Sequence, residues 1–143
     1  MDNAKRVISG TWGEVWLNGE HVGECFGLQA KLSFNKEDVS ICRQMAVDSK
    51  IISTKGTGSL KLHKVNSRMA ITIGGKIRNG EDVRFTIVSK LADPDSYGAE
   101  RVSISNVSLD DLTIADWTAA QKGTVESPFT FTDYKYLDMI GVR

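Results

Sequence analysis

Alternating apolar and polar residues mark several extended segments of the chain. Between residues 22 and 34 most even positions are apolar, and most odd positions are polar or glycine. A period of two places successive side chains on opposite faces of a strand. We therefore expect a strand that buries one face, formed by Val22, Phe26, Leu28, Ala30, Leu32 and Phe34. Similar patterns predict strands over residues 7–17, 59–65, 83–91, 101–107, 112–117 and 125–136.

Short turn signals separate these segments. Asn18-Gly19 suits a type I′ hairpin turn, because both central residues of that turn need a positive φ. We interpret the glycine-rich stretch 55–58 as a bulge or tight bend, and residues 93–98 as a dense turn. Pro128 lacks a backbone N–H, so it predicts an edge or inter-chain position near the start of the last strand.

One segment has helical periodicity. We predict a helix over residues 67–79, with Ser67 as its N-cap. An apolar stripe on one side should dock on the sheet, and it consists of Met69, Ile73 and Ile77. The pair Gly74-Gly75 makes this a weak helix.

Residues 35–54 show neither the period of two typical of a strand nor the period of 3.6 typical of a helix. A twenty-residue connector is long for a compact domain, and its β-branched residues argue against disorder. We interpret the segment as an extended arm that finds its partner in another chain. Its expected contacts are Val39, Ile41, Met45, Ile51 and Ile52. The end segments Asp2–Val7 and Leu137–Val142 are further interface candidates, especially Val7, Leu137 and Ile140.

Six or seven antiparallel strands and one helix predict a mainly β fold. We expect an antiparallel β-sandwich or barrel with one flanking α-helix and an extended arm, in a single domain of residues 1–143. The composition agrees, because Val, Ile and Thr make up 33 of the 143 residues. The sequence has no run of 18 apolar residues and no signal-peptide core, so we expect a cytosolic chain without a membrane span.

Motifs for chemistry are absent from the sequence. The 18 basic and 18 acidic residues give a net charge of zero, which argues against a protein built mainly to neutralise phosphates. Cys25 and Cys42 are expected to be free thiols. His21 and His63 have no partner at metal-ligand spacing. We therefore expect no metal, no cofactor and no enzymatic activity.

The tryptophans leave a second interpretation open. Trp12, Trp16 and Trp117 suit core or interface packing, since tryptophan buries a large area. Trp12 and Trp16 could instead form a stacking face in a monomeric β-barrel module that binds a ligand.

Four groups of residues, in order along the chain, resemble tail tube proteins of contractile phage tails of the PBSX-prophage type. They are Ile8–Gly19 (ISGTWGEVWLNG), Lys55–Ser59 with Lys64–Arg68, Asp93–Val102, and Ser127–Thr132. Together they cover nearly the whole chain. The tubes of clostridial phage-tail-like bacteriocins are also similar.

The resemblance implies a fold, a function and partners. Family members are β-sandwich-like subunits with one flanking helix, and six of them close a ring whose inner sheets join into a barrel around a lumen. Stacked rings form the inner tail tube inside a sheath, which serves envelope penetration or DNA passage. The implied partners are further copies of the chain and the sheath, baseplate, tape-measure and terminator proteins, with DNA only as non-specific lumen cargo in a phage.

The implied location is the host bacterial cytoplasm during assembly, and afterwards a virion tail or a released tail-like particle. The tube of a type VI secretion-like injection system is an alternative that uses the same ring. A lumen crossed by a polyanion should be lined by the polar face of the inner strands, so that the cargo slides. The candidates are Arg84, Thr86, Ser103, Ser105, Thr130 and Thr132.

Overall fold

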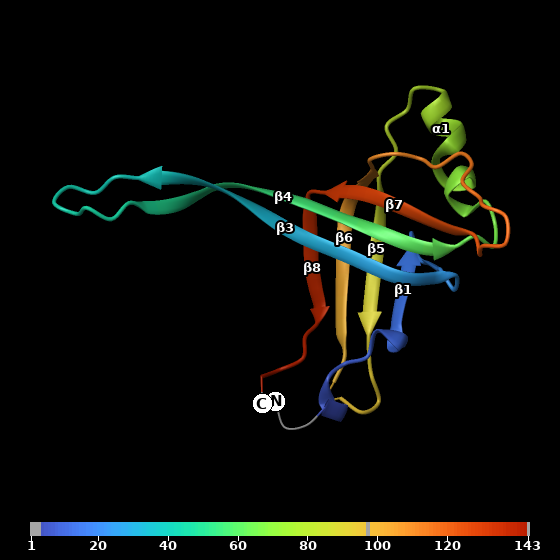
Figure 1. The fold of residues 1–143 in the computed structure, drawn as a ribbon, viewed down its shortest axis with the longest axis horizontal. Coiled ribbons are helices and arrows are strands. Elements are labelled where there is room, and N and C mark those ends of the chain that lie inside the picture. Colours follow the sequence, from blue (N-terminus) through green and yellow to red (C-terminus); the bar gives the residue numbers. More distant parts are fainter. Residues whose placement is uncertain (1–3, 97, 143) are drawn as a thin grey trace.

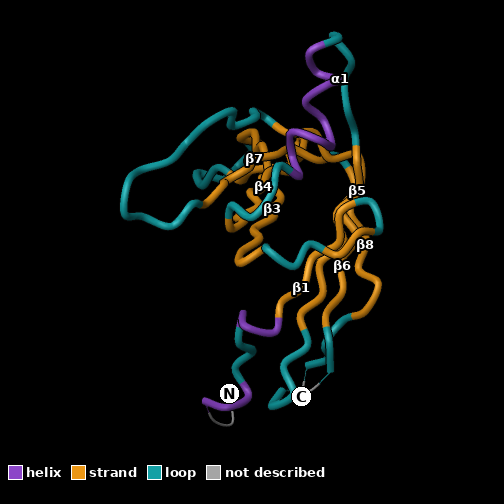
Figure 2. The backbone as a smooth tube through the Cα atoms, turned by 90° about the vertical axis from the view of Figure 1, so that its right-hand side faces the viewer, coloured by secondary structure: helices purple, strands orange, loops and turns teal. Residues whose placement is uncertain are grey.

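Two antiparallel sheets lie across one another in the computed structural model, which describes residues 4–96 and 98–142 (Figures 1 and 2). Sheet A comprises β1 (Gly13–Leu17), β2 (Glu20–His21), β5 (Phe85–Leu91), β6 (Glu100–Leu109) and β8 (Asp133–Asp138). Sheet B comprises β3 (Cys25–Val39), β4 (Asp48–His63) and β7 (Thr124–Phe131), and it joins the end of β6. The mainly β, antiparallel fold expected from the sequence is confirmed.

Strand β6 belongs to both sheets. Residues 101–105 of β6 pair with β8, whereas Ser108 and Leu109 pair with β7. Between these two parts Asn106 has a φ of 56°, a left-handed conformation that asparagine tolerates better than most residues. Its Nδ2 donates a hydrogen bond of 2.7 Å to Oγ1 of Thr132, the residue between β7 and β8. The segment 125–136, predicted as one strand, is therefore two strands in different sheets.

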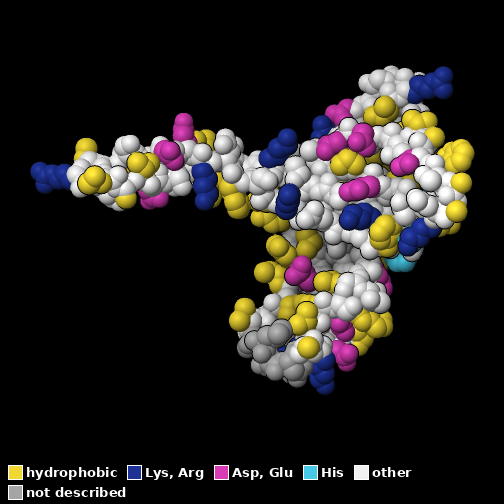
Figure 3. Space-filling model, viewed as in Figure 1, with side chains coloured by type: hydrophobic (Ala, Val, Ile, Leu, Met, Phe, Trp, Pro, Cys, Tyr) yellow, Lys and Arg dark blue, Asp and Glu magenta, His cyan; other side chains and the backbone are white. Residues whose placement is uncertain are grey.

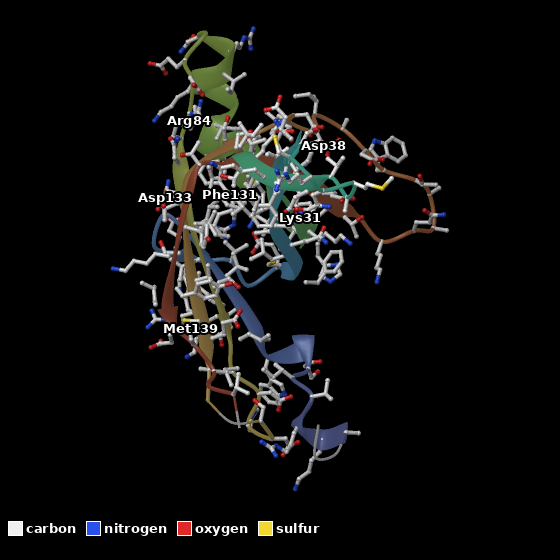
Figure 4. The ribbon with its side chains drawn as sticks, turned by 90° about the vertical axis from the view of Figure 1, so that its left-hand side faces the viewer. Lys31, Asp38, Arg84, Phe131, Asp133 and Met139 are labelled. Atoms are coloured by element: carbon white, nitrogen blue, oxygen red, sulfur yellow. The ribbon has the colours of Figure 1, made fainter. Side chains whose placement is uncertain are left out.

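The core lies where the two sheets cross, and Phe131 points between them (Figure 4). Phe129 and Phe131 of β7 lie against the backbone of Gly58 and Gly56 in β4. A Cβ added to Gly58 would lie 2.6 Å from Cζ of Phe129 and would overlap a backbone oxygen of β3. The stretch 55–58 is thus part of strand β4, and the predicted bend is wrong: the glycines make room for aromatic rings.

The first strand is shorter than predicted. Strand β1 begins at Gly13, because Gly10–Trp12 form a 3-10 turn whose N-cap, Ser9, accepts a hydrogen bond from the N–H of Thr11. A second 3-10 turn spans Ala4–Arg6. The Asn18-Gly19 turn is confirmed, with φ values of 50° and 85°.

The flanking helix, defined here as residues 68–78, is confirmed but is not uniformly α-helical. Its middle, η3 (Ala70–Gly74), is π-helical, and α1 (Gly75–Arg78) completes it. The N–H of Arg68 donates to Oδ1 of Asn66 at 3.0 Å, so Asn66 provides a side-chain cap at the start of the helix.

The predicted apolar stripe of the flanking helix is only partly buried, and the helix also carries an exposed isoleucine outside the stripe. Met69 and Ile73 are buried against the core as expected. Ile77, expected in the same stripe, is 49% exposed, and Ile71 is 81% exposed. Ile77 is four residues after Ile73 and keeps its side of the helix, but it lies in the last turn, α1, which buries none of its residues.

The segment 35–54 is a β-hairpin. Strands β3 and β4 pair with each other as far as Val39 and Asp48, whereas β4 pairs with β7 only as far as Gly56. Beyond that point the hairpin projects alone from the body (Figure 1). We expected an extended arm that finds its partner in another chain. For the main-chain hydrogen bonds this expectation is wrong, because the two strands of the segment pair with each other. An irregularity between Asn35 and Lys36 shifts the register, which explains why no period of two is visible in the sequence.

Residues 112–117 form no strand. They belong to the connection between β6 and β7, where Ile114 and Trp117 are exposed. The N–H of Asp110 donates to the carbonyl of Pro128 at 2.9 Å, just past the last β6–β7 pair. Pro128 has no N–H to return a second bond to Asp110, so pairing with β6 stops there, and β7 is an edge on that side from Pro128 back to Thr124.

An ion pair ties the flanking helix to the connection between β2 and β3. Nε of Arg68 lies 2.5 Å from Oε1 of Glu24, and the Glu24 side chain is only 9% exposed. The hydrogen bond from Arg68 holds the pKa of the Glu24 carboxyl below its ordinary value of 4.5, although burial works in the opposite direction. Since the folded-state pKa is lowered, the pair stabilises the fold above pH 4.5 and loses this contribution as the pH falls through the folded-state pKa.

We predict that Glu24→Gln lowers the free energy of unfolding by about 1–3 kcal/mol at neutral pH, because it leaves Arg68 without its charged partner. The difference between wild type and variant should shrink as the pH falls below about 4.5. Urea denaturation at a series of pH values measures it. A difference that stays constant down to pH 3 would contradict the assignment.

Gly58→Ala should lower the free energy of unfolding by about 1–3 kcal/mol, because its Cβ meets Phe129 and the β3 backbone. Gly75→Ala is the matched control: a Cβ there has nothing within 4 Å, so the change should raise stability by up to about 1 kcal/mol. Thermal and urea denaturation of both variants test the pair. Equal effects would show that the glycines of β4 are not packing positions.

Candidate assembly surfaces

The projecting hairpin carries exposed apolar side chains on both strands and at its tip. It includes five of the predicted interface residues, all of them exposed: Val39, Ile41, Met45, Ile51 and Ile52. Figure 3 shows these apolar side chains between charged ones along the projection. A two-stranded ribbon has no core of its own, so its apolar side chains remain in water in the isolated chain. The hairpin is therefore a candidate contact surface.

The charges on the hairpin are mixed. Glu37 pairs in register with Lys50, and Val39 pairs with Asp48. The turn at the tip includes Arg43, whose φ is 66°. Apolar residues interleaved with charges of both signs are typical of an interface that is both apolar and specific.

The remaining interface candidates lie elsewhere. Val7 and Leu137 are exposed, and Ile140 is half-buried beside Gly98. The two chain ends come together at the far end of sheet A, away from the hairpin (Figure 1). The structure therefore divides the eight predicted residues into a hairpin group and a group at the chain ends. Asp2 and Asn3, and Tyr97 of the quoted turn motif, lie outside the described residues.

The predicted lumen residues also fall into two groups. Thr86, Ser103 and Ser105 alternate with buried residues of β5 and β6, so they lie on the outer face of sheet A. Thr130 lies between buried Phe129 and Phe131, so it lies on the outer face of sheet B. These two faces point to opposite sides of the sandwich, and one channel can be lined by only one of them.

The last two candidates lie near strand ends. Arg84 precedes β5 and forms an exposed ion pair of 2.9 Å with Asp82. Thr132 is exposed and accepts the hydrogen bond from Asn106. Figure 4 shows Arg84 beside the upper end of sheet A and Asp133 on the side of sheet A away from Lys31.

The outer face of sheet B is polar over its whole width. The registers of β3, β4 and β7 place these residues on it: Gln29, Lys31, Ser33, Lys55, Thr57, Ser59, Lys61, Glu126 and Thr130. Figure 3 shows this face as polar with lysines spread over it. Except for Thr130 these residues were missed as lumen candidates, although the alternation in 22–34 already places Gln29, Lys31 and Ser33 on one polar face.

The outer face of sheet A differs from that of sheet B. It carries Trp16 and Val88 opposite each other, and Trp16 contacts His21 edge-to-face at 5.5 Å between ring centroids. Its charges are balanced across strands, since Glu14 pairs with Lys90 in register. Sheet A therefore presents a mixed apolar and charged surface, whereas sheet B presents a hydrophilic one.

An open cleft of about 350 Å³ separates strand β3 from sheet A. One wall is the even face of β3, with Leu28 and Leu32, and the other includes Val102 and Tyr136. The expected burial of that face is confirmed only at Val22, and Phe34 is 55% exposed. The two sheets diverge at this end, so their inward faces do not meet.

The structure offers little for catalysis. In the described ranges, no three His, Cys, Asp or Glu side chains gather as metal ligands would. Burial raises the pKa of the Cys25 thiol, which lowers its reactivity, and Cys42 is exposed and free. Neither Trp12 nor Trp16 lines the cleft beside β3 or the cleft between β1 and the start of β3.

None of the helices in the described part of the chain is both long enough and apolar enough to cross a bilayer.

Comparison with known proteins identifies the fold. Residues 2–138 match the family model described as "Phage tail tube protein". The chain is 31% identical over 133 residues to the phage-like element PBSX protein XkdM of Bacillus subtilis (strain 168), a match that covers 92% of this chain and 90% of XkdM.

Solved structures show the same architecture. A chain in the sheath-tube complex of an extracellular contractile injection system, PVC, in its extended state superposes with a TM-score of 0.69 at 11% identity, covering 92% of both chains. A chain of the anti-feeding prophage tube-terminating cap has a TM-score of 0.72 at 13% identity, covering 97% of this chain and 96% of that one. The two crossed sheets, the flanking helix and the family match over nearly the whole sequence agree, and the chain belongs to the phage tail tube family.

Proposed function

We propose that six copies of this chain close a ring and that stacked rings form the inner tube of a contractile phage tail or tail-like particle. The observation that carries this is the free edge of sheet B. Strand β3 is 15 residues long and is the last strand of its sheet, so one side of its backbone has no partner strand in the described chain. An unpaired edge of that length invites association, and closing sheets into a ring removes such edges.

Sheet B then forms the wall of the lumen. Its outer face is hydrophilic, which suits a water-filled channel, and its lysines and hydroxyl groups lie along the path of the cargo. Of the sequence candidates this keeps Thr130 and Thr132 in the lumen. It moves Thr86, Ser103 and Ser105 to the outside of the tube, on the face that carries Trp16 and Val88.

The hairpin links neighbouring subunits or successive rings in this arrangement. Its apolar residues are removed from water only in contact with another copy. Such burial contributes about 25 cal/mol per Å² of apolar surface to the free energy of association. The group at the chain ends, Val7, Leu137 and Ile140, supplies further contacts between copies. The machinery around the tube follows from the family: a sheath, a baseplate, a tape-measure protein and a terminator, with DNA as non-specific cargo in a phage.

Neighbouring proteins support these partners. The structures with the same fold come from a sheath-tube complex and from a tube-terminating cap. We place assembly in the cytoplasm of the host bacterium, followed by a virion tail or a released particle, and we assign the chain no enzymatic role. A type VI secretion-like tube would use the same ring, and the match to phage tail tube proteins favours the phage-tail function. A monomeric ligand-binding module is disfavoured, because neither Trp12 nor Trp16 lines the cleft beside β3 or the cleft between β1 and the start of β3.

Replacing residues 37–50 by Asn-Gly should abolish tube formation and leave the subunit folded. Lys36 and Ile51 are paired in register, so a two-residue turn can join them without disturbing the body of the sheet. Negative-stain electron microscopy and light scattering over a concentration series measure assembly, and circular dichroism reports the fold. Tubes of normal length from the shortened chain would refute the role of the hairpin.

Assembly should protect sheet B and leave the outer face of sheet A accessible. Thr57→Cys and Ser103→Cys, each in a background with Cys25→Ala and Cys42→Ser, place a single thiol on one face or the other. A maleimide coupled to serum albumin, which is too bulky to enter a channel, should modify both variants as monomers. In tubes it should modify only the Ser103→Cys variant, measured by gel shift. The reverse pattern would put sheet A on the lumen.

A further inference from the structure

The flanking helix has a second face that nothing in its own chain covers. Ile71 is 81% exposed on this face, whereas Met69 and Ile73 on the other side are buried in the core. Gly75 lies in the same helix, and a Cβ built there would meet nothing within 4 Å. Ile71 and Gly75 are four residues apart and form an apolar surface that another molecule can approach closely. The last turn of the same helix carries charged residues.

No packing contact within the subunit requires a glycine at position 75. Glycine inside a helix costs about 1 kcal/mol relative to alanine. In β4 the cost at Gly56 and Gly58 is explained, because aromatic rings occupy the space of a side chain. At Gly75 that space is empty in the isolated chain, so a close approach by another molecule would explain the residue.

The open cleft between β3 and sheet A is complementary to this helix surface, because it has apolar walls and an acidic residue. It is formed by inward faces of both sheets that would be core if the sandwich were closed, with Leu28, Leu32, Val102 and Tyr136 on its walls. Glu100 also lines it, and within residues 4–96 and 98–142 its carboxylate has no hydrogen bond or ion pair. Lys31 also lines this cleft but forms no ion pair with Glu100 in the described chain, so a cation from the occupant would give this carboxylate a charged partner.

We infer that this cleft receives the flanking helix of a neighbouring copy in the ring. Ile71 would enter the space between β3 and sheet A, with Gly75 beside it permitting a close approach, and the cationic last turn of the helix would face Glu100. That turn carries Lys76 and Arg78 and no acidic residue. The inference rests on the proposed ring, and it identifies the two surfaces that meet within it.

The placement of the two surfaces explains why a second copy is the occupant. The helix stands beyond the β7 side of sheet B (Figures 1 and 2), and the cleft is lined by β3, the strand at the opposite edge of that sheet. A copy shifted across the strands, so that its β7 side follows the free β3 edge, moves its helix toward the cleft. The two surfaces differ, so the contact is heterologous, and repeating it with a constant rotation closes a ring.

The test uses two variants of the full chain that block one surface each. Ile71→Asp puts a charge on the exposed helix face, and Tyr136→Arg puts a bulky cation in the cleft. Neither residue belongs to the buried core, so both variants should keep the wild-type melting temperature. Each should fail to form rings alone, with at least a tenfold rise in the concentration needed. Mixed in equal amounts they should give a 1:1 dimer and nothing larger, since only one productive pairing exists.

A control variant and two different contrary outcomes separate this inference from the proposed function. Ile114→Asp, at an equally exposed residue away from the cleft and off the helix, should assemble as the wild type does. Analytical ultracentrifugation and native mass spectrometry distinguish monomer, mixed dimer and ring. Assembly of Ile71→Asp at wild-type concentrations would overturn this inference and leave the ring intact. A wild type that never associates, with no mixed dimer, would overturn both the inference and the proposed function.

The charge contact has its own readout. Glu100→Lys should block ring formation, and adding Lys76→Glu and Arg78→Glu in the same chain should restore it. Failure to restore assembly, when each variant melts at the wild-type temperature, would remove Glu100 from the interface.

Discussion

A hydrogen bond joins two of the points at which the chain passes from one sheet to the other. Nδ2 of Asn106, in the bend of β6, donates to Oγ1 of Thr132, between β7 and β8. Because β6 pairs with β8 on one side of the bend and with β7 on the other, the two sheets must cross and then diverge. The crossing forms the core, and the divergence leaves the cleft beside β3 open.

This geometry explains why so much apolar surface is exposed. Sheet B continues past the core as the β3–β4 hairpin, where nothing in the chain covers Val39 or Met45. The flanking helix buries one face on the core and exposes Ile71 on the other. Each of these surfaces lies at a different side of the molecule. In the proposed ring, neighbouring copies of the chain would cover these apolar surfaces and pair with the free sheet edges.

The distinctive features of this molecule are its surfaces rather than reactive groups. The half-buried Cys25 thiol and the ion pair of Arg68 with Glu24 are structural features, and no three His, Cys, Asp or Glu side chains of the described residues gather as metal ligands would. What distinguishes the molecule is the contrast between a hydrophilic outer face on sheet B and a mixed face on sheet A. That contrast assigns an inside and an outside to a ring.

Local signals in the sequence were sufficient for the antiparallel β architecture, the Asn18-Gly19 turn and the start of the flanking helix, because each depends on neighbours along the chain. Motif resemblance also led to the family. Three features needed the tertiary structure: the self-paired hairpin, the division of residues 125–136 between two sheets, and the opposite orientations of Ser103 and Thr130. A period of two says that a strand has two faces but not which faces share a side of the molecule. That depends on how strands cross, and long-range pairs such as Asn106 with Thr132 decide it.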